Sequence, residues 1–287
     1  VKKPLESGKA IFEAFIKLTS DKDCPWEFTC VREQFPALAS QKRDRPYALI
    51  TAANVLNELF WDERIHLDMR AQRVLENLAG NAVPGTKLLI IEPGEPRSGT
   101  MITALRESIL IHKGLVLSPC THNRACPMPG SYLSAAMRAI KSGKPVPKGV
   151  PEPVNMPASR TKYPWCHFVL NTDTAPKRLQ TLSQEAGIPK ERLVASWLYA
   201  ELPHKQERLA NSSRPQKNKR TCIRIISDSI VANGKVYRYG CGEPGYIMAG
   251  RPFSQYPSST VIEIENADAY FSGVFDKKAH ALIMEYC

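Results

Sequence analysis

Three short apolar runs decide the fold class: YALITAA at residues 47–53, KLLII at 87–91 and LVL at 115–117. Two stretches with helical spacing separate them, at 54–77 and 99–112, and Ser98 is the expected cap of the second. Parallel neighbouring strands need helical crossovers, so this alternation predicts an α/β fold with a parallel sheet. In such sheets the functional loops follow the carboxyl ends of the strands.

The rest of the chain predicts a remainder of this sheet and a separate β module. A strand is expected from WCHF at 165–168, a helix at 175–186 and a strand at 193–200. Alternating β-formers and an Asn233-Gly234 turn then predict a small C-terminal antiparallel β module, with strands at 223–230, 235–239, 245–248 and 260–265.

These patterns divide the chain into three expected regions. A partial α/β domain spans 1–118, and cysteine-rich loops, a basic insertion and the remainder of the sheet span 119–204. A basic linker and the β module span 205–287.

The charge balance favours a polyanionic partner. The chain has 39 Lys and Arg against 28 Asp and Glu, a formal net charge of +11. Such an excess favours RNA, although a solvated basic surface without a partner is the alternative. No apolar run is long enough to span a bilayer, so no membrane partner is expected. The candidates for phosphate contacts are Lys141, Lys144, Lys148, Arg214, Lys217, Lys219 and Arg220.

Four of the eight cysteines lie in loops or turns. Cys120 and Cys126 flank a loop within PCTHNRACP, Cys166 lies in WCHF, and Cys241 lies in a Gly-rich turn. Thiolates on such loops suit a tetrahedral metal or an iron–sulfur cluster. Spacing alone does not choose between them. His122 and His167 keep a mixed Cys/His zinc site open, and buried structural cysteines are the alternative to any metal.

The residues of these loops also resemble a known family. NVLNEL at 54–59, IEPGEP at 91–96, Arg106, SPCTHNRACP at 118–127 and WCHF at 165–168 are similar to the methyltransferase-like small-ribosomal-subunit assembly family. The resemblance covers roughly residues 47–241. It implies a class I methyltransferase-like, Rossmann-type sheet and a 4Fe–4S cluster. It also implies Cys120, Cys126, Cys166 and Cys241 as cluster ligands, with Cys222 as the less favoured fourth.

The resemblance implies partners and a compartment as well. The partners are small-subunit rRNA and small-subunit proteins, bound by a monomer. A eukaryotic member would act in the mitochondrial matrix and a bacterial one in the cytoplasm. The long basic insertion between Cys126 and Cys166 departs from the family pattern.

The sequence leaves catalysis open. The Gly-rich turn that binds S-adenosylmethionine is absent before residue 47. We expect a non-catalytic assembly factor as the chain stands. The alternative is an rRNA methyltransferase whose cofactor-binding half lies upstream of residue 1, with Asn54 and Glu92 near the cofactor. Capping and turn contacts are the alternative roles of these two residues. A third alternative is a zinc-stabilised RNA-binding module.

Overall fold

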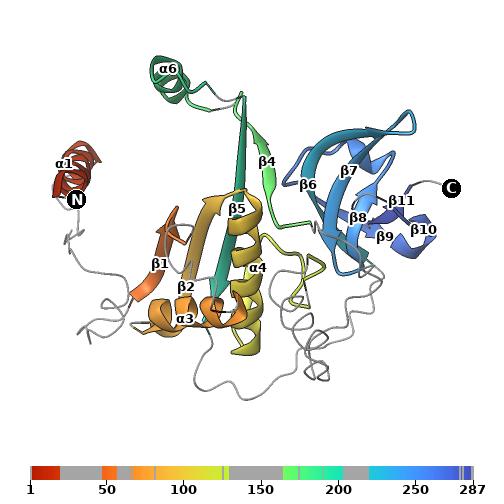
Figure 1. Ribbon diagram of the computed structural model, residues 1–287, viewed down its shortest axis with the longest axis horizontal. Coiled ribbons are helices and arrows are strands. Elements are labelled where there is room, and N and C mark those ends of the chain that lie inside the picture. Colours follow the sequence, from red (N-terminus) through yellow and green to blue (C-terminus); the bar gives the residue numbers. More distant parts are fainter. Residues whose placement is uncertain are drawn as a thin grey trace.

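The computed structural model contains two β-sheets, one of which carries helices (Figure 1). It describes residues 2–19, 47–56, 65, 67–80, 82–124, 126–128, 164–173, 175–189, 191–202, 220–277, 279 and 281–285. The expectation of an α/β fold is confirmed. The elements up to residue 201 are α1 (Lys2–Thr19), β1 (Tyr47–Ala53), α3 (Leu67–Ala79), β2 (Ala82–Pro93), α4 (Pro96–Ile111), β3 (Leu115–Ser118), β4 (Phe168–Asn171), α6 (Lys177–Glu185) and β5 (Arg192–Glu201).

The first sheet is mixed, and the expectation of a parallel sheet holds for only part of it. Its strand order is β1-β2-β5-β3, and β4 also pairs with β5. β1 and β2 are parallel, whereas β5 runs antiparallel to β2, β3 and β4. The reversed β5 therefore separates β2 from β3, which run in the same direction. An apolar run records that a strand is buried, but it does not record its direction.

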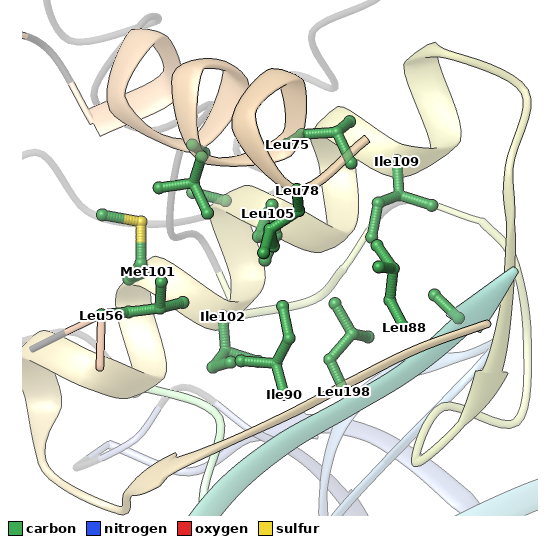
Figure 2. Packing of buried hydrophobic residues seen from close by; sticks show 14 of the residues in the cluster. Leu56, Leu75, Leu78, Leu88, Ile90, Met101, Ile102, Leu105, Ile109 and Leu198 are labelled. Atoms are coloured by element: carbon green, nitrogen blue, oxygen red, sulfur yellow. The ribbon is translucent and has the colours of Figure 1, made fainter. Parts of the chain in front are cut away.

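Helices α3 and α4 cover one face of this sheet and form its core (Figure 2). Side chains from α3 and α4 face those of β2 and β5, and burying each Leu or Ile contributes roughly 1.5–3 kcal/mol. The labelled members of this core are Leu56, Leu75, Leu78, Leu88, Ile90, Met101, Ile102, Leu105, Ile109 and Leu198, all of them buried.

The two helices on the first sheet compare differently with those expected. The helix predicted at 54–77 is confirmed from Leu67 onward as α3, whereas Asn54 has a left-handed backbone with φ of 53° and is not helical. Residues 57–64 and 66 lie outside the described part. Ser98 is not the cap of α4: Glu95 occupies that position, and Pro96 starts the helix because its ring fixes a helical φ. Ser98 is instead buried within the first turn.

The second sheet contains six strands, and its strand β6 lies beside β4 of the first sheet (Figure 1). Its order is β10-β11-β8-β7-β6-β9, with one parallel pair, β11–β8. The hairpin turn predicted at Asn233-Gly234 is confirmed, since both residues have positive φ. The two strands that the sequence did not predict are β10 and β11. The elements are β6 (Arg220–Ala232), β7 (Lys235–Gly242), β8 (Gly245–Ala249), η1 (Phe253–Gln255), β9 (Val261–Glu265), η2 (Ala267–Tyr270), β10 (Phe271–Phe275) and β11 (Leu282–Met284).

A small apolar cluster joins the two sheets. Phe168 of β4 and Ile226 of β6 are each 1% exposed, and they pack with Cys126, Met128 and Cys166. Trp197 of the first sheet and Tyr239, Cys241 and Tyr246 of the second lie at the edge of this cluster. None of the described helices is both long and apolar enough to cross a membrane.

Candidate functional site

The structure brings the four predicted cysteines to a single cavity between the two sheets. Cys120 and Cys126 lie in the loop after β3, and Cys166 lies two residues before β4. The expectation of a turn at Cys241 is wrong, since Cys241 lies near the end of strand β7, just before the turn. All four line the same cavity. Cys222, the less favoured substitute, is half-buried on β6 and is not among the residues that line it.

Burial favours the neutral thiol at Cys126, Cys166 and Cys241, because it raises the pKa of each. Cys126 and Cys166 are 7% and 8% exposed. Burial raises the pKa of Cys126 to about 12, although Arg106 opposes the change. Burial and repulsion from the neighbouring cysteines also raise the pKa values of Cys166 and Cys241 well above their ordinary range. Ionising these buried thiols at the same time therefore requires added positive charge, which a metal supplies.

Arg106 on α4 contacts the cysteine loop at several points. Its Nε donates to Cys120 Sγ at 3.1 Å, and its Nη2 donates to the carbonyl oxygens of His122 and Arg124 at 2.9 and 2.7 Å. Its Nη1 lies 2.7 Å from Glu107 Oε1. Burial lowers the pKa of Arg106, but the neighbouring cysteines and Glu107 raise it more, so its pKa stays above the ordinary value. Arg106 is therefore a fixed buried cation beside the thiols.

Arg224 approaches the same loop from the second sheet. It lies directly opposite Cys241 in the β6–β7 ladder. Its Nε donates to the carbonyl oxygen of Pro119, and its Nη1 donates to that of Ser259 at 2.7 Å. Burial lowers the pKa of Arg224, whereas Cys241 and Cys120 raise it. A second cation therefore lies near the cysteines.

Two further contacts tie the cysteine loop to the second sheet. Thr121 Oγ1 donates to the carbonyl oxygen of Cys222 at 3.0 Å. Arg124 Nη2 lies 2.8 Å from Glu243 Oε1, an exposed pair that contributes little energy. The loop is thus bonded both to α4 and to the second sheet.

The segment before β4 is held against α4 and β5. Trp165 Nε1 donates to the carbonyl oxygen of Gly94 at 2.9 Å, and Ser196 Oγ donates to that of Cys166 at 2.5 Å. At Gly99, in the first turn of α4, a Cβ would lie 2.7 Å from Trp165 Cδ1 and closer still to the Cys166 oxygen. This close approach fixes where Cys166 enters the cavity.

His122 and His167, the histidines of the possible mixed zinc site, have different surroundings. His122 lines the cavity, and burial together with Arg106 and Arg124 lowers its pKa to about 4, so its imidazole is neutral. Its Nδ1 accepts a hydrogen bond from the Arg124 backbone at 3.1 Å. His167 stacks on Trp165 with ring centroids 5.0 Å apart. Within the described residues, no three Cys, His, Asp or Glu side chains form a group that could hold a metal ion.

Asn54 and Glu92, the residues expected near S-adenosylmethionine, link the end of β2 to the turn that follows β1. Glu92 at the end of β2 is 1% exposed, and its Oε1 accepts hydrogen bonds from the backbone N–H groups of Val55 and Leu56 at 2.9 and 2.8 Å. The backbone N–H of Asn54 donates to the carbonyl oxygen of Ile91 at 2.9 Å. Glu92 thereby holds the turn that follows β1, and cofactor binding at these residues stays a prediction.

Most of the candidate phosphate contacts fall outside the described residues. The exception is Arg220 at the start of β6, which is exposed and pairs with Glu265 at 2.8 Å. The candidates that lie outside are Lys141, Lys144, Lys148, Arg214, Lys217 and Lys219.

Some site residues were not found from the sequence patterns. Arg106 entered only through the family resemblance, and Arg224, Glu107 and Gly99 were not identified. The sequence does contain a signal for Arg106, since a lone charge at this position lies on the apolar face of its helix, between Ile102 and Ile109. Neither the close approach at Gly99 nor the position of Arg224 opposite Cys241 has a comparable signal.

Comparison with known proteins supports the family resemblance. Residues 27–135 match the family model described as mitochondrial small ribosomal subunit Rsm22. The match includes β1, α3, β2, α4 and β3 together with Cys120 and Cys126. No curated protein matches the chain. The family expected from the sequence is therefore supported over residues 27–135, where the chain is similar to this family of the mitochondrial small ribosomal subunit.

Proposed function

We propose that this chain is an assembly factor of the small ribosomal subunit that binds rRNA and holds a 4Fe–4S cluster. Cys120, Cys126, Cys166 and Cys241 would be the cluster ligands. The observation that carries the proposal is that cysteines from both sheets line one cavity, although 121 positions separate the first from the last. When bound, the cluster supplies a covalent link between the sheets, and such a link contributes directly to folding.

The chemistry of the site fits an anionic cluster. Four thiolates around an iron–sulfur core carry net negative charge, and a buried anion needs nearby cations or hydrogen-bond donors. Arg106 donates to one sulfur, and Arg224 lies opposite another in the β6–β7 ladder. The apolar lining, which includes Met128, Phe168 and Trp197, limits the access of water.

A single zinc ion is the less favoured occupant. Zinc requires each sulfur within about 2.3 Å, and the described residues contain no group arranged to hold one ion. A 4Fe–4S core takes four thiolate ligands, and all four candidate cysteines line the cavity. His122 Nδ1 already accepts a backbone hydrogen bond, which leaves only its other nitrogen for a metal.

The first sheet would then act as a methyltransferase-like scaffold. Parallel β1 and β2 end at the turn that Glu92 holds, the edge where sheets of this class bind ligands. Because one oxygen of this buried carboxylate accepts two backbone N–H groups, a structural role for Glu92 is favoured over contact with S-adenosylmethionine. We therefore propose that the chain as it stands does not transfer methyl groups.

The family and the charge support the proposed partners. The family is that of the mitochondrial small ribosomal subunit, and the excess of 11 positive charges suits rRNA. In a eukaryotic cell the protein would act in the mitochondrial matrix.

Metal analysis of anaerobically purified protein tests the cluster. We expect iron and acid-labile sulfide in equal amounts, about four of each per chain, and visible absorbance that Cys120→Ser abolishes. Cys222→Ser is the matched control, because Cys222 is half-buried near the loop without lining the cavity. Stoichiometric zinc without iron, or a cluster that survives Cys120→Ser unchanged, would overturn the assignment.

A further inference from the structure

We infer that Arg106 and Arg224 are positioning residues for the cluster, the first supplied by α4, which covers the first sheet, and the second by β6 of the second sheet. Together they hold the loop of Cys120 between the sheets and place positive charge beside the sulfurs. This inference rests on the proposed function, since it concerns the same four cysteines.

The contacts of Arg106 exceed those needed to stabilise α4 alone. Its side chain is 2% exposed, and a buried guanidinium is costly unless acceptors satisfy it. Its three nitrogens contact Cys120 Sγ, two carbonyl oxygens of the cysteine loop and Glu107 Oε1. Glu107 Oε1 also accepts the backbone N–H of Cys126 at 3.1 Å. Arg106 and Glu107 therefore fix both cysteines of the loop relative to α4.

Arg224 performs the matching task from β6. It binds the carbonyl oxygen of Pro119, the residue before Cys120, and it lies across the ladder from Cys241. The same side chain thus contacts the loop of the first candidate ligand, Cys120, and lies opposite the last, Cys241. Its contact with Ser259 keeps it on the second sheet.

The two arginines bind nearly consecutive points of one loop from opposite sides. Arg224 donates to the carbonyl oxygen of Pro119. Arg106 donates to Cys120 Sγ and to the carbonyl oxygens of His122 and Arg124. Correct placement of Cys120 therefore requires both sheets to be in contact.

The two arginines also affect the redox properties of the cluster. A fixed cation beside a cluster favours its more negative, reduced state, so the loss of either charge should shift the midpoint potential downward.

Iron retention and redox titration of the full chain test this inference. We expect Arg224→Gln to lose iron to a chelator roughly ten- to a hundred-fold faster than the unmodified protein, the range typical of residues that support metal ligands. Its remaining cluster should have a more negative midpoint potential. Arg224→Lys keeps the charge without the fork of donors, so its potential should stay near that of the unmodified protein while its iron loss quickens.

Arg238 provides a matched control within the same sheet. It also holds two carbonyl oxygens, those of Ser254 and Ser227, at 2.9 and 3.0 Å, but it does not line the cavity. Arg238→Gln should leave the potential and iron retention unchanged. Arg106→Lys is the corresponding variant on α4, with circular dichroism as the check that it folds.

The possible results separate the two proposals. Unmodified protein without iron overturns the cluster and this inference together. A cluster-containing protein whose potential and iron retention are the same in Arg224→Gln as in Arg238→Gln overturns the inference alone. A lowered potential in Arg224→Gln that Arg224→Lys restores supports it.

Discussion

At Gly99 the backbone of α4 approaches the segment before β4 too closely for any side chain. A Cβ there would meet Trp165 Cδ1 at 2.7 Å and the Cys166 oxygen at a shorter distance. Gly99→Ala therefore has to displace Cys166 from its place in the cavity. We expect it to lower the free energy of unfolding by about 1–3 kcal/mol, the usual cost of overpacking, and to reduce the iron that the protein retains. Urea unfolding and iron analysis measure the two effects.

A second helical glycine is the control for this substitution. Gly8 in α1 has nothing within 4 Å of its Cβ position. Gly8→Ala should leave iron retention unchanged and should not lower stability, because Ala favours a helix by up to about 1 kcal/mol. If Gly99→Ala behaved like Gly8→Ala, the close approach would have no bearing on the site.

At this scale the sequence identified the candidate ligands but not the residues that support them. Cys120 and Cys126 lie beside proline, Cys241 lies beside glycine, and Cys166 lies between Trp165 and His167, so all four could be found from their neighbours. No comparable pattern of neighbouring residues identifies Arg224. Its importance comes from register, since it faces Cys241 only once β6 and β7 have paired. Such pairings depend on tertiary structure rather than on local pattern.

The β6–β7 hairpin is the element that sets this register. Gly234 in its turn has φ of 73°, with open space at its Cβ position, so a substitution there meets backbone strain alone. We expect Gly234→Ala to lower the free energy of unfolding by about 1 kcal/mol. Asn233→Gly should change it by only a few tenths, because Asn and Gly both adopt positive φ. Urea unfolding of the two variants checks the difference, and equal losses would contradict the type of turn.

The apolar patterns predicted the positions of most helices and strands, but they did not predict the direction of every strand. β1 has the bounds of its apolar run, and β3 is one residue longer than its run. β2 has 12 residues where the apolar run has five, and α4 begins at Pro96, before the predicted start, and ends at Ile111. The antiparallel β5 was not foreseen, because LVASWLYA at 193–200 fits a buried strand of either direction. β10 and β11 were missed because FSGVF in β10 contains a glycine of positive φ and does not alternate, and β11 has only three residues.

At the scale of the whole molecule, the cysteine cavity joins two sheets that are built differently. The first is mixed and carries helices, whereas the second is mostly antiparallel. In the described part, few polar contacts outside the cysteine loop join the two sheets. One of them is the hydrogen bond from the backbone N–H of Val169 to Ser258 Oγ, at 3.2 Å. A group that binds all four cysteines would therefore stabilise the association of the sheets more than either sheet alone.

The net charge leads to a prediction about rRNA binding by the full chain. If six or more of the candidate lysines and arginines contact phosphates, affinity for a small-subunit rRNA transcript should fall by about a thousand-fold or more between 50 and 200 mM salt. Replacing Lys141, Lys144 and Lys148 by Gln should weaken binding and lower the slope of log affinity against log salt by about 3, about one for each contact removed. Filter binding across a salt series measures both.

The matched control removes the same charge from lysines that carboxylates already neutralise. Lys9 lies 3.7 Å from Glu13, Lys235 lies 3.2 Å from Glu285, and Lys87 pairs with Glu201. Replacing these three by Gln changes the net charge equally, yet it should leave the slope unaltered, because the slope counts ions released from phosphates rather than total charge. Equal slopes for both triple variants would show that binding follows overall charge. In that case the basic insertion would have no specific part in holding rRNA.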